Sequence, residues 1–292
     1  MNHIEVFKYD EICWWCEKKA DTNEHKIKKS VYDKFYGKGS YKNLGDSFPL
    51  LIKDGKNYKL QSSNDNKLTF KKTLCKQCNN ESSQPFDRAY DVFIEYYLDN
   101  QETIIQESKF DYQKIFGDNW KIQKLNLYKY FTKYFCCQIA TGNYKISQEI
   151  IDFLNDNSGL KHLKFYFQIK IAIVSYLKIF KETHDPFPYL HIGNTFYYKD
   201  EKKEFVDTIF NWFTINGLSI NLVYNKNINY LFDSSEKNLL NDKLDCIEIV
   251  DMERCPSFLD RNLSELYNIF EYSDVDINDK YKSELVSKIL GT

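Results

Sequence analysis

Four of the eight cysteines stand in two closely spaced pairs, Cys13/Cys16 and Cys75/Cys78. Each pair has the spacing C-x2-C, and 58 residues lie between the two pairs. Two chelating pairs of thiolates suit tetrahedral zinc, and four sulfur ligands leave no coordination position open for water. We therefore expect one structural Zn²⁺ that joins two distant segments. A redox dithiol is the weaker interpretation, because a redox C-x-x-C normally stands in a thioredoxin-like α/β context that this polar segment lacks.

The compartment follows from the same cysteines and from the absence of long apolar runs. The other four, Cys136, Cys137, Cys246 and Cys255, have no His or Cys neighbour at ligand spacing, so we interpret them as buried thiols. No uninterrupted apolar run reaches the roughly 20 residues of a membrane span, and the first residues lack the layout of a signal peptide. We expect a cytoplasmic protein with no membrane association, in which the thiols stay reduced.

An acid, a base and three cations follow the first cysteine pair within six residues. Glu24 and His25 are adjacent, and Lys26, Lys28 and Lys29 come directly after them. Phosphodiester hydrolysis requires a group that takes a proton from water, a divalent ion that neutralises charge on phosphate, and cations that hold the strand. A neutral imidazole suits the first task, and a carboxylate is an oxygen ligand for Mg²⁺.

An amide could complete the same ion site. Asn79 follows the second cysteine pair directly, and its amide oxygen could bind the ion that Glu24 holds. Asn80 competes for this role. Without the zinc pairs on either side, an adjacent Glu and His would ordinarily be surface residues, and their position between the pairs is what favours a functional interpretation.

These three motifs together resemble the HNH endonucleases. The segments "CWWC", "NEHKIKKS" and "LCKQCNNESSQPFDRAYD" occur in that family's order and cover roughly residues 10–95. The resemblance implies a ββα-metal fold braced by zinc on the four cysteines. It implies that His25 is the general base, that Glu24 binds a catalytic Mg²⁺ or Mn²⁺, and that Asn79 is the ligand on the helix. We prefer Asn79 to Asn80 because the family's ligand directly follows the second cysteine.

Two features depart from the family pattern. The family's middle Asn, which helps to orient the base, usually precedes the final ligand by eight or nine residues, where this chain has Phe70 or Lys71. Asn66 is 13 residues before Asn79 and Asn64 is farther, so the middle role stays unassigned. Strand alternation also sends Glu24 and His25 to opposite faces, so the two can share a site only if the strand ends or distorts there.

Charge is distributed unevenly along the chain. Residues 1–90 hold 17 Lys and Arg against 12 Asp and Glu, whereas residues 91–292 hold 23 against 30. A basic N-terminal part attached to an acidic remainder predicts phosphate binding at one end, although lysine-rich surfaces arise without it. We expect Lys26, Lys28, Lys29 and Arg88 to contact nucleic acid, and Asp87 to orient a neighbour.

The patterning predicts an α+β protein with two units. Turn-rich strands are expected between about 49 and 75, followed by a helix from about 86 to 97 that leads away from the second cysteine pair. Helices are expected over 126–140 and over the apolar run 160–180, strands over 218–224 and 245–252, and a helix over 259–290. We divide the chain into a zinc-stabilised HNH finger, residues 1–105, and a mainly helical unit with a few strands, residues 106–292.

The expected function is metal-dependent hydrolysis of nucleic acid, with double-stranded DNA as the favoured substrate. By analogy with the family alone, such an enzyme could serve a defence or mobile-element system, with the C-terminal unit binding a protein partner, a second copy or the target. Two alternatives stay open: a non-catalytic zinc-binding nucleic-acid module, and an HNH nuclease that cleaves RNA. A pure binding module has no chemical need to combine Glu24, His25 and Asn79.

Overall fold

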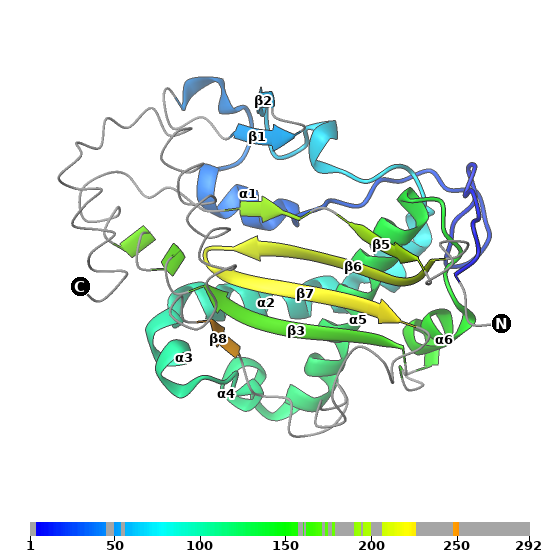
Figure 1. The fold of residues 1–292 in the computed structure, drawn as a ribbon. Coiled ribbons are helices and arrows are strands. Elements are labelled where there is room, and N and C mark those ends of the chain that lie inside the picture. Colours follow the sequence, from blue (N-terminus) through cyan, green and yellow to red (C-terminus); the bar gives the residue numbers. More distant parts are fainter. Residues whose placement is uncertain are drawn as a thin grey trace.

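The computed structural model combines helices and strands, as an α+β class requires (Figure 1). It describes residues 4–44, 50–53, 56–156, 160, 162–170, 173–174, 177–178, 190–193, 195–199, 206–225 and 248–250. The helix expected over 259–290 lies outside the described residues. No helix among the described residues is long and apolar enough to cross a bilayer.

The N-terminal part consists mainly of loops and short elements. An isolated β-bridge joins Ile12 to Lys19 around the first cysteine pair, and others join Thr22 to Leu74 and His25 to Thr69. Between these paired segments the chain forms helix α1 (Lys29–Tyr36) and the antiparallel strands β1 (Leu50–Lys53) and β2 (Lys56–Lys59). Short 3-10 turns at Tyr41–Asn43 and Asn66–Leu68 complete the segment. Of the short strands predicted for this region, those at β1 and β2 are confirmed, whereas residues 67–75 contain part of a 3-10 turn and only isolated bridges at Thr69 and Leu74.

A helical segment leads away from the second cysteine pair, as predicted. It opens with a π-helix over Gln77–Ser82 and continues as α2 (Gln84–Asp99), with Pro85 in its first turn, where the missing N–H costs nothing. The side chains that α2 buries recur at spacings of three and four residues: Phe86, Ala89, Tyr90, Phe93, Ile94 and Tyr97. This apolar face packs against the long helix α5 (Trp120–Thr141).

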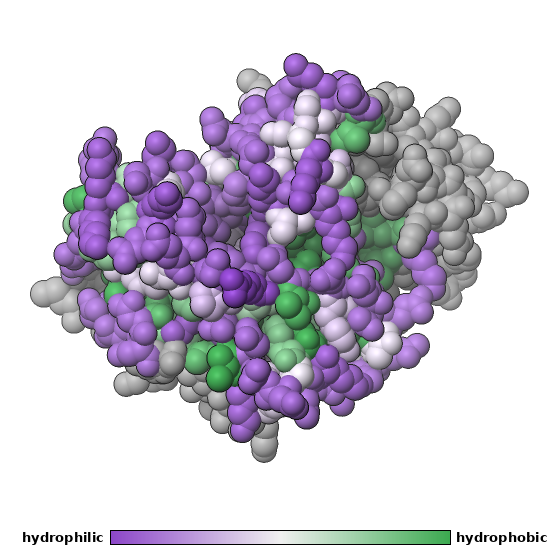
Figure 2. All heavy atoms as spheres, turned by 180° about the vertical axis from the view of Figure 1, so that it is seen from behind, coloured by the Kyte–Doolittle hydropathy of each residue, from purple (hydrophilic) through white to green (hydrophobic). Residues whose placement is uncertain are grey.

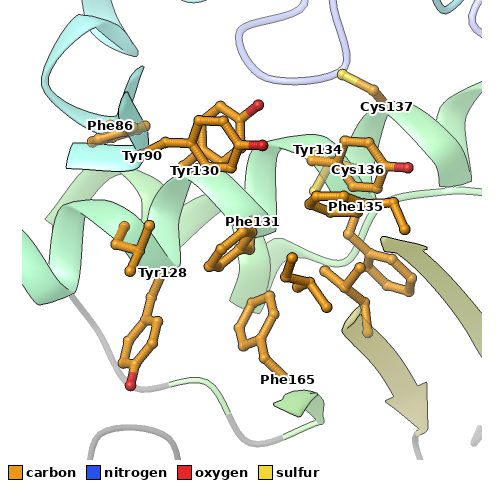
Figure 3. Close-up of a cluster of buried hydrophobic side chains, with 14 of the residues drawn as sticks. Phe86, Tyr90, Tyr128, Tyr130, Phe131, Tyr134, Phe135, Cys136, Cys137 and Phe165 are labelled. Atoms are coloured by element: carbon orange, nitrogen blue, oxygen red, sulfur yellow. The ribbon is translucent and has the colours of Figure 1, made fainter. Parts of the chain in front are cut away.

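Helix α5 lies at the centre of the molecule and is buried on two sides. Short helices α3 (Gln101–Glu107) and α4 (Tyr112–Phe116) and a 3-10 turn (Gly117–Asn119) precede it, and α6 (Gln148–Asp156) follows. Phe131 of α5 packs against the sheet at Phe165 and Phe213, whereas Tyr134 also reaches Phe70 of the N-terminal part (Figure 3). The helix predicted over residues 126–140 is confirmed in α5, whose buried residues include the polar side chains of Lys129, Thr132 and Lys133 as well as aromatic ones.

One sheet packs against α2 and α5 and lies in front of these helices in Figure 1. It contains β3 (Leu163–Lys170), β4 (Leu190–Ile192), β5 (Phe196–Lys199), β6 (Val206–Ile215), β7 (Leu218–Asn225) and β8 (Glu248–Val250). The strand order is β4-β6-β7-β3-β8, and β5 also pairs with β6. Only the β3–β8 pairing is parallel among the pairs described. The strand predicted over 218–224 is confirmed in β7, and the described part of the strand predicted over 245–252 is β8.

The helix predicted over residues 160–180 is wrong in its first half. Residues Leu163–Lys170 form β3, which pairs with β7 from Leu163↔Tyr224 to Ile169↔Leu218. Within β3, Leu163, Phe165, Phe167 and Ile169 are buried, whereas Lys164 and Gln168 are partly exposed. This alternation is the period of a strand with one buried face, and the interpretation of 160–180 as one apolar element overlooked it. With six strands in its sheet, the part after residue 105 is also richer in strand than we expected.

The hydrophobic core runs without interruption from the cysteine pairs to the sheet. A single cluster of buried side chains includes Trp14 and Phe70 of the N-terminal part, Phe131 of α5 and Leu222 of β7. The division at residue 105/106 therefore crosses one continuous core. On the opposite side of the molecule from Figure 1, hydrophilic side chains cover most of the described surface (Figure 2).

Candidate metal centre and acidic cluster

The four paired cysteines meet in the folded chain. The sulfur atoms of Cys13, Cys16, Cys75 and Cys78 all lie within 4.8 Å of one another. Cys16 Sγ and Cys75 Sγ are 3.5 Å apart, and only Cys16 is partly exposed. Four convergent sulfur atoms in a largely buried position could hold a metal such as zinc.

Main-chain hydrogen bonds give each pair its conformation. The Cys13 amide donates to Lys18 O at 2.7 Å, and Glu17, with a φ of 62°, donates back to Cys13 O at 2.8 Å. In the second pair the Cys78 amide donates to Cys75 Sγ at 3.5 Å, and the Asn79 amide donates to Cys75 O at 2.9 Å. Each pair is thus a tight turn that points its sulfur atoms inward.

The thiols of this cluster differ in acidity because they share hydrogen bonds. A hydrogen bond from the Cys78 thiol lowers the pKa of Cys13 to about 5, against the opposing effect of burial. Burial raises the pKa of Cys16. The thiolate form of Cys13 is therefore favoured at neutral pH. Because the thiolate is the form that binds metal, this favours binding of a cation to the cluster.

Two antiparallel segments lead from the cysteines to the acid and base. Thr22 donates to Leu74 O at 3.0 Å, Phe70 donates to Glu24 O at 2.8 Å, and Lys26 donates to Leu68 O at 2.8 Å. The bridges at Thr22↔Leu74 and His25↔Thr69 differ in register by two residues. The pairing of the two segments is therefore irregular between these bridges.

His25 is half-buried, and a main-chain carbonyl holds its ring. His25 Nε2 lies 3.1 Å from Ser63 O, and Ser63 Oγ in turn donates to Asp33 Oδ1 at 2.7 Å. Burial lowers the pKa of His25, and the charges of Lys29 and Lys133 act in the same direction. The imidazole is therefore neutral near pH 7. Ser63 contacts the ring through its main-chain oxygen, so the residue type at position 63 does not predict the contact.

Glu24 lies in a buried ion pair with a residue of α5. Lys133 Nζ is 3.2 Å from Glu24 Oε2 and 3.0 Å from Asp87 Oδ1 of α2. The side chain of Glu24 is 12% exposed and that of Lys133 only 1%. Burial raises the pKa of Glu24, and the ammonium group of Lys133 opposes that rise.

Asn79 joins the same cluster from the π-helix. Its Nδ2 donates to Asn23 O, the carbonyl that precedes Glu24, at 3.2 Å, and Ser83 Oγ donates to Asn79 O at 2.5 Å. Asn79 Oδ1 is buried and has no hydrogen-bond partner among the described residues. Asn80 is exposed. The structure therefore brings Asn79, and not Asn80, beside the segment that carries Glu24 and His25.

Lys133 is the member of this cluster that we did not predict. Its Nζ also donates to Ser83 Oγ at 3.2 Å, so one ammonium group contacts two carboxylates and a hydroxyl. Lysine is almost never fully buried unless paired. A lysine in the apolar helix expected over 126–140 was therefore a signal that an acidic partner lies opposite it.

The lysines expected on nucleic acid have different surroundings. Lys28 pairs with Asp91 at 2.6 Å, and its side chain is 18% exposed. Lys26 donates to Lys67 O at 3.3 Å. Lys29 is half-buried and lines an open groove of about 820 Å³ together with Lys34, Lys38, Asp33 and Glu95. Arg88 is exposed on α2. Lys28 is thus already paired with a protein carboxylate.

Comparisons with protein families, curated proteins and solved structures found no match. The chemistry of the site is therefore inferred from the residues themselves.

Proposed function

We propose that this chain is a metal-dependent endonuclease of the HNH type, acting on nucleic acid and preferentially on double-stranded DNA. The arrangement that supports this proposal begins with two antiparallel segments, residues 22–26 and 68–74, which are followed directly by the helical segment from Gln77 to Asp99. This order of elements, with four cysteines at one end, fits a zinc-braced ββα-metal finger. The zinc would be structural because four thiolates leave no open ligand position.

The observation that carries the proposal is the unpartnered oxygen of Asn79. A buried polar atom normally has a hydrogen-bond partner, and an exception calls for an explanation such as an ion that binds there. The amide nitrogen of Asn79 is fixed on Asn23 O, so the oxygen is left free for another contact. An amide oxygen and the carboxylate of neighbouring Glu24 are ligands of the kind that Mg²⁺ and Mn²⁺ prefer. A bound divalent ion would neutralise charge that develops on the phosphate.

His25 supplies the base in this proposal. Its pKa is lowered by burial, so the neutral form that accepts a proton is present at neutral pH. The contact with Ser63 O occupies one ring nitrogen and leaves the other for water. Ser63 thereby takes the orienting role for which the sequence offered no asparagine at the family's spacing.

A second candidate is a zinc-binding nucleic-acid module without catalysis. One observation favours it: the carboxylate of Glu24 already has a cationic partner in Lys133, 3.2 Å away. In that case Glu24 and Lys133 would serve packing alone, and binding would depend on surface lysines such as Lys29.

Cleavage assays separate the two candidates. Purified protein is incubated with supercoiled plasmid, linear DNA and RNA, with Mg²⁺, with Mn²⁺ and with a chelator. His25→Ala should lower the cleavage rate on the order of 10²–10⁴-fold, as expected for loss of a general base, while zinc content and nucleic-acid affinity stay unchanged. Cleavage that persists in chelator would contradict the metal-dependent mechanism.

A pair of neighbouring asparagines provides the matched control. Asn79→Ala should lower the rate and raise the Mg²⁺ concentration that gives half-maximal activity, because it removes the proposed ligand. Asn80→Ala alters the next residue, which is exposed, and should leave both values unchanged. Equal behaviour of the two variants would remove Asn79 from the site.

A further inference from the structure

The buried ammonium group of Lys133 links two segments that carry the proposed site. It contacts Glu24 Oε2 at 3.2 Å on the segment 22–26, and Asp87 Oδ1 at 3.0 Å and Ser83 Oγ at 3.2 Å at the start of α2. Lys28 reinforces the same region by donating to the carbonyl oxygen of Asp87. These contacts determine where the carboxylate of Glu24 can lie.

We propose that Lys133, together with Asp87, is a positioning residue that fixes the carboxylate of Glu24 for its role in the nuclease site. The inference rests on the proposed function and adds to it a requirement for α5, an element outside the stretch that resembles HNH enzymes. Lys133 is 1% exposed, so it does not contact substrate and acts only through Glu24.

The geometry explains why a lysine suits this task. A compact ammonium group has three donors, and Lys133 directs them at a carboxylate, a second carboxylate and a hydroxyl. Its contact is to Oε2 of Glu24. One oxygen of Glu24 is thus anchored while the other is left for the divalent ion of the proposed mechanism.

A purely structural role is the competing explanation, and the same helix provides its control. Lys129 is one turn before Lys133 on α5, is 5% exposed, and donates to Leu154 O at 2.8 Å. Lys129 is thus another buried lysine of this helix. Its ammonium group lies near the rings of Phe86 and Phe153. Matched substitutions at 129 and 133 therefore separate loss of a buried lysine from displacement of Glu24.

The experiment compares Lys133→Arg with Lys129→Arg. The guanidinium group keeps the charge at position 133 but replaces a compact donor by a planar fork, which displaces Glu24. A displacement of about 1 Å at a reacting centre costs on the order of 10²-fold in rate. We expect that loss in Lys133→Arg, together with a severalfold higher Mn²⁺ concentration for half-maximal cleavage. Lys129→Arg should stay within about twofold of wild type for both values at equal folded fraction.

Two further measurements make the outcome decisive. Direct Mn²⁺ binding, followed by the electron paramagnetic resonance of free Mn²⁺, should weaken in Lys133→Arg and not in Lys129→Arg. Zinc content and the thermal unfolding midpoint give the folded fraction of each variant. A Lys133→Arg protein with wild-type cleavage and wild-type Mn²⁺ affinity would overturn the inference and leave the nuclease proposal intact. If the wild type cleaves no nucleic acid, the nuclease proposal fails, and unchanged Mn²⁺ binding in Lys133→Arg then refutes the positioning role separately.

Discussion

Replacing Lys133 by methionine should lower the free energy of unfolding more than the same replacement at any other lysine of α5. Methionine retains the length and much of the apolar stem of lysine but removes the charge. Glu24 and Asp87 then remain in place, 12% and 23% exposed, without their shared cation. Loss of one partner of a buried ion pair leaves an uncompensated charge, which typically costs about 3–5 kcal/mol. We expect a loss in that range at pH 7–8.

The corresponding change at position 129 sets the reference. Lys129→Met removes one hydrogen bond to Leu154 O and leaves that carbonyl without its donor. It also removes a buried ammonium group. Burial disfavours the charged form of Lys129 and lowers its pKa, so losing the charge offsets part of the loss in stability. The expected cost is about 1 kcal/mol. A difference of about 2 kcal/mol or more between the two methionine variants is therefore the quantity to measure.

Urea unfolding of the two single variants and of Lys133→Met combined with Glu24→Gln gives the test. Neutralising Glu24 in the Lys133→Met background should restore stability, with a coupling free energy of about 1–3 kcal/mol.

The pH dependence of stability provides a second check. Burial raises the pKa of Glu24, and loss of the opposing ammonium group raises it further above its unfolded value, so the folded state binds more protons at mildly acidic pH. The loss in free energy of unfolding that Lys133→Met causes, relative to wild type, should consequently become smaller as the pH falls from 8 toward 5. Additive losses, or a deficit that grows on acidification, would refute the ion-pair reasoning.

Three other predictions concern the metal, the base and the cations. Protein prepared without added zinc should contain about one equivalent by metal analysis, and Cys78→Ser should lower that content and shift tryptophan emission to longer wavelength as the neighbouring segment unfolds. The acidic limb of the cleavage rate should have its midpoint below pH 6.5, the ordinary pKa of histidine, because burial lowers the pKa of His25; a midpoint above 6.5 would contradict this. Lys29→Gln should weaken nucleic-acid binding and reduce its salt dependence by about one counterion. Lys28→Gln should chiefly lower stability, since Lys28 is held by Asp91.

Local patterns predicted the cysteine cluster well. Chelating spacing is a property of four consecutive residues, so the two cysteine pairs could be recognised without the fold, and their sulfur atoms do converge. The helices over 86–97 and 126–140 were also predictable, because α2 has a clear apolar period and α5 is long and free of Pro and Gly. The roles of Glu24, His25 and Asn79 in catalysis stay predictions.

Features that depend on distant partners could not be predicted in the same way. Strand β3 is an exception, because its alternation of buried residues such as Leu163 and Phe165 with the partly exposed Lys164 is a local pattern that the expected helix over 160–180 overlooked. Ser63 contacts His25 through its main chain, and no side-chain pattern marks such a contact. Lys133 was not predicted because its acidic partner at position 24 is more than a hundred residues away in the chain. These contacts come from the fold as a whole.

The separation between Glu24 and Lys133 has a consequence for how the protein is made. Because Lys133 follows Glu24 by 109 residues in the chain, a ribosome has synthesised the cysteine pairs, His25 and all of α2 before the ammonium group exists. The nascent N-terminal segment can form its sulfur cluster while the carboxylates of Glu24 and Asp87 are still unpaired. Closure of the acidic cluster therefore has to follow the synthesis of α5, and a chain truncated before α5 lacks this cluster.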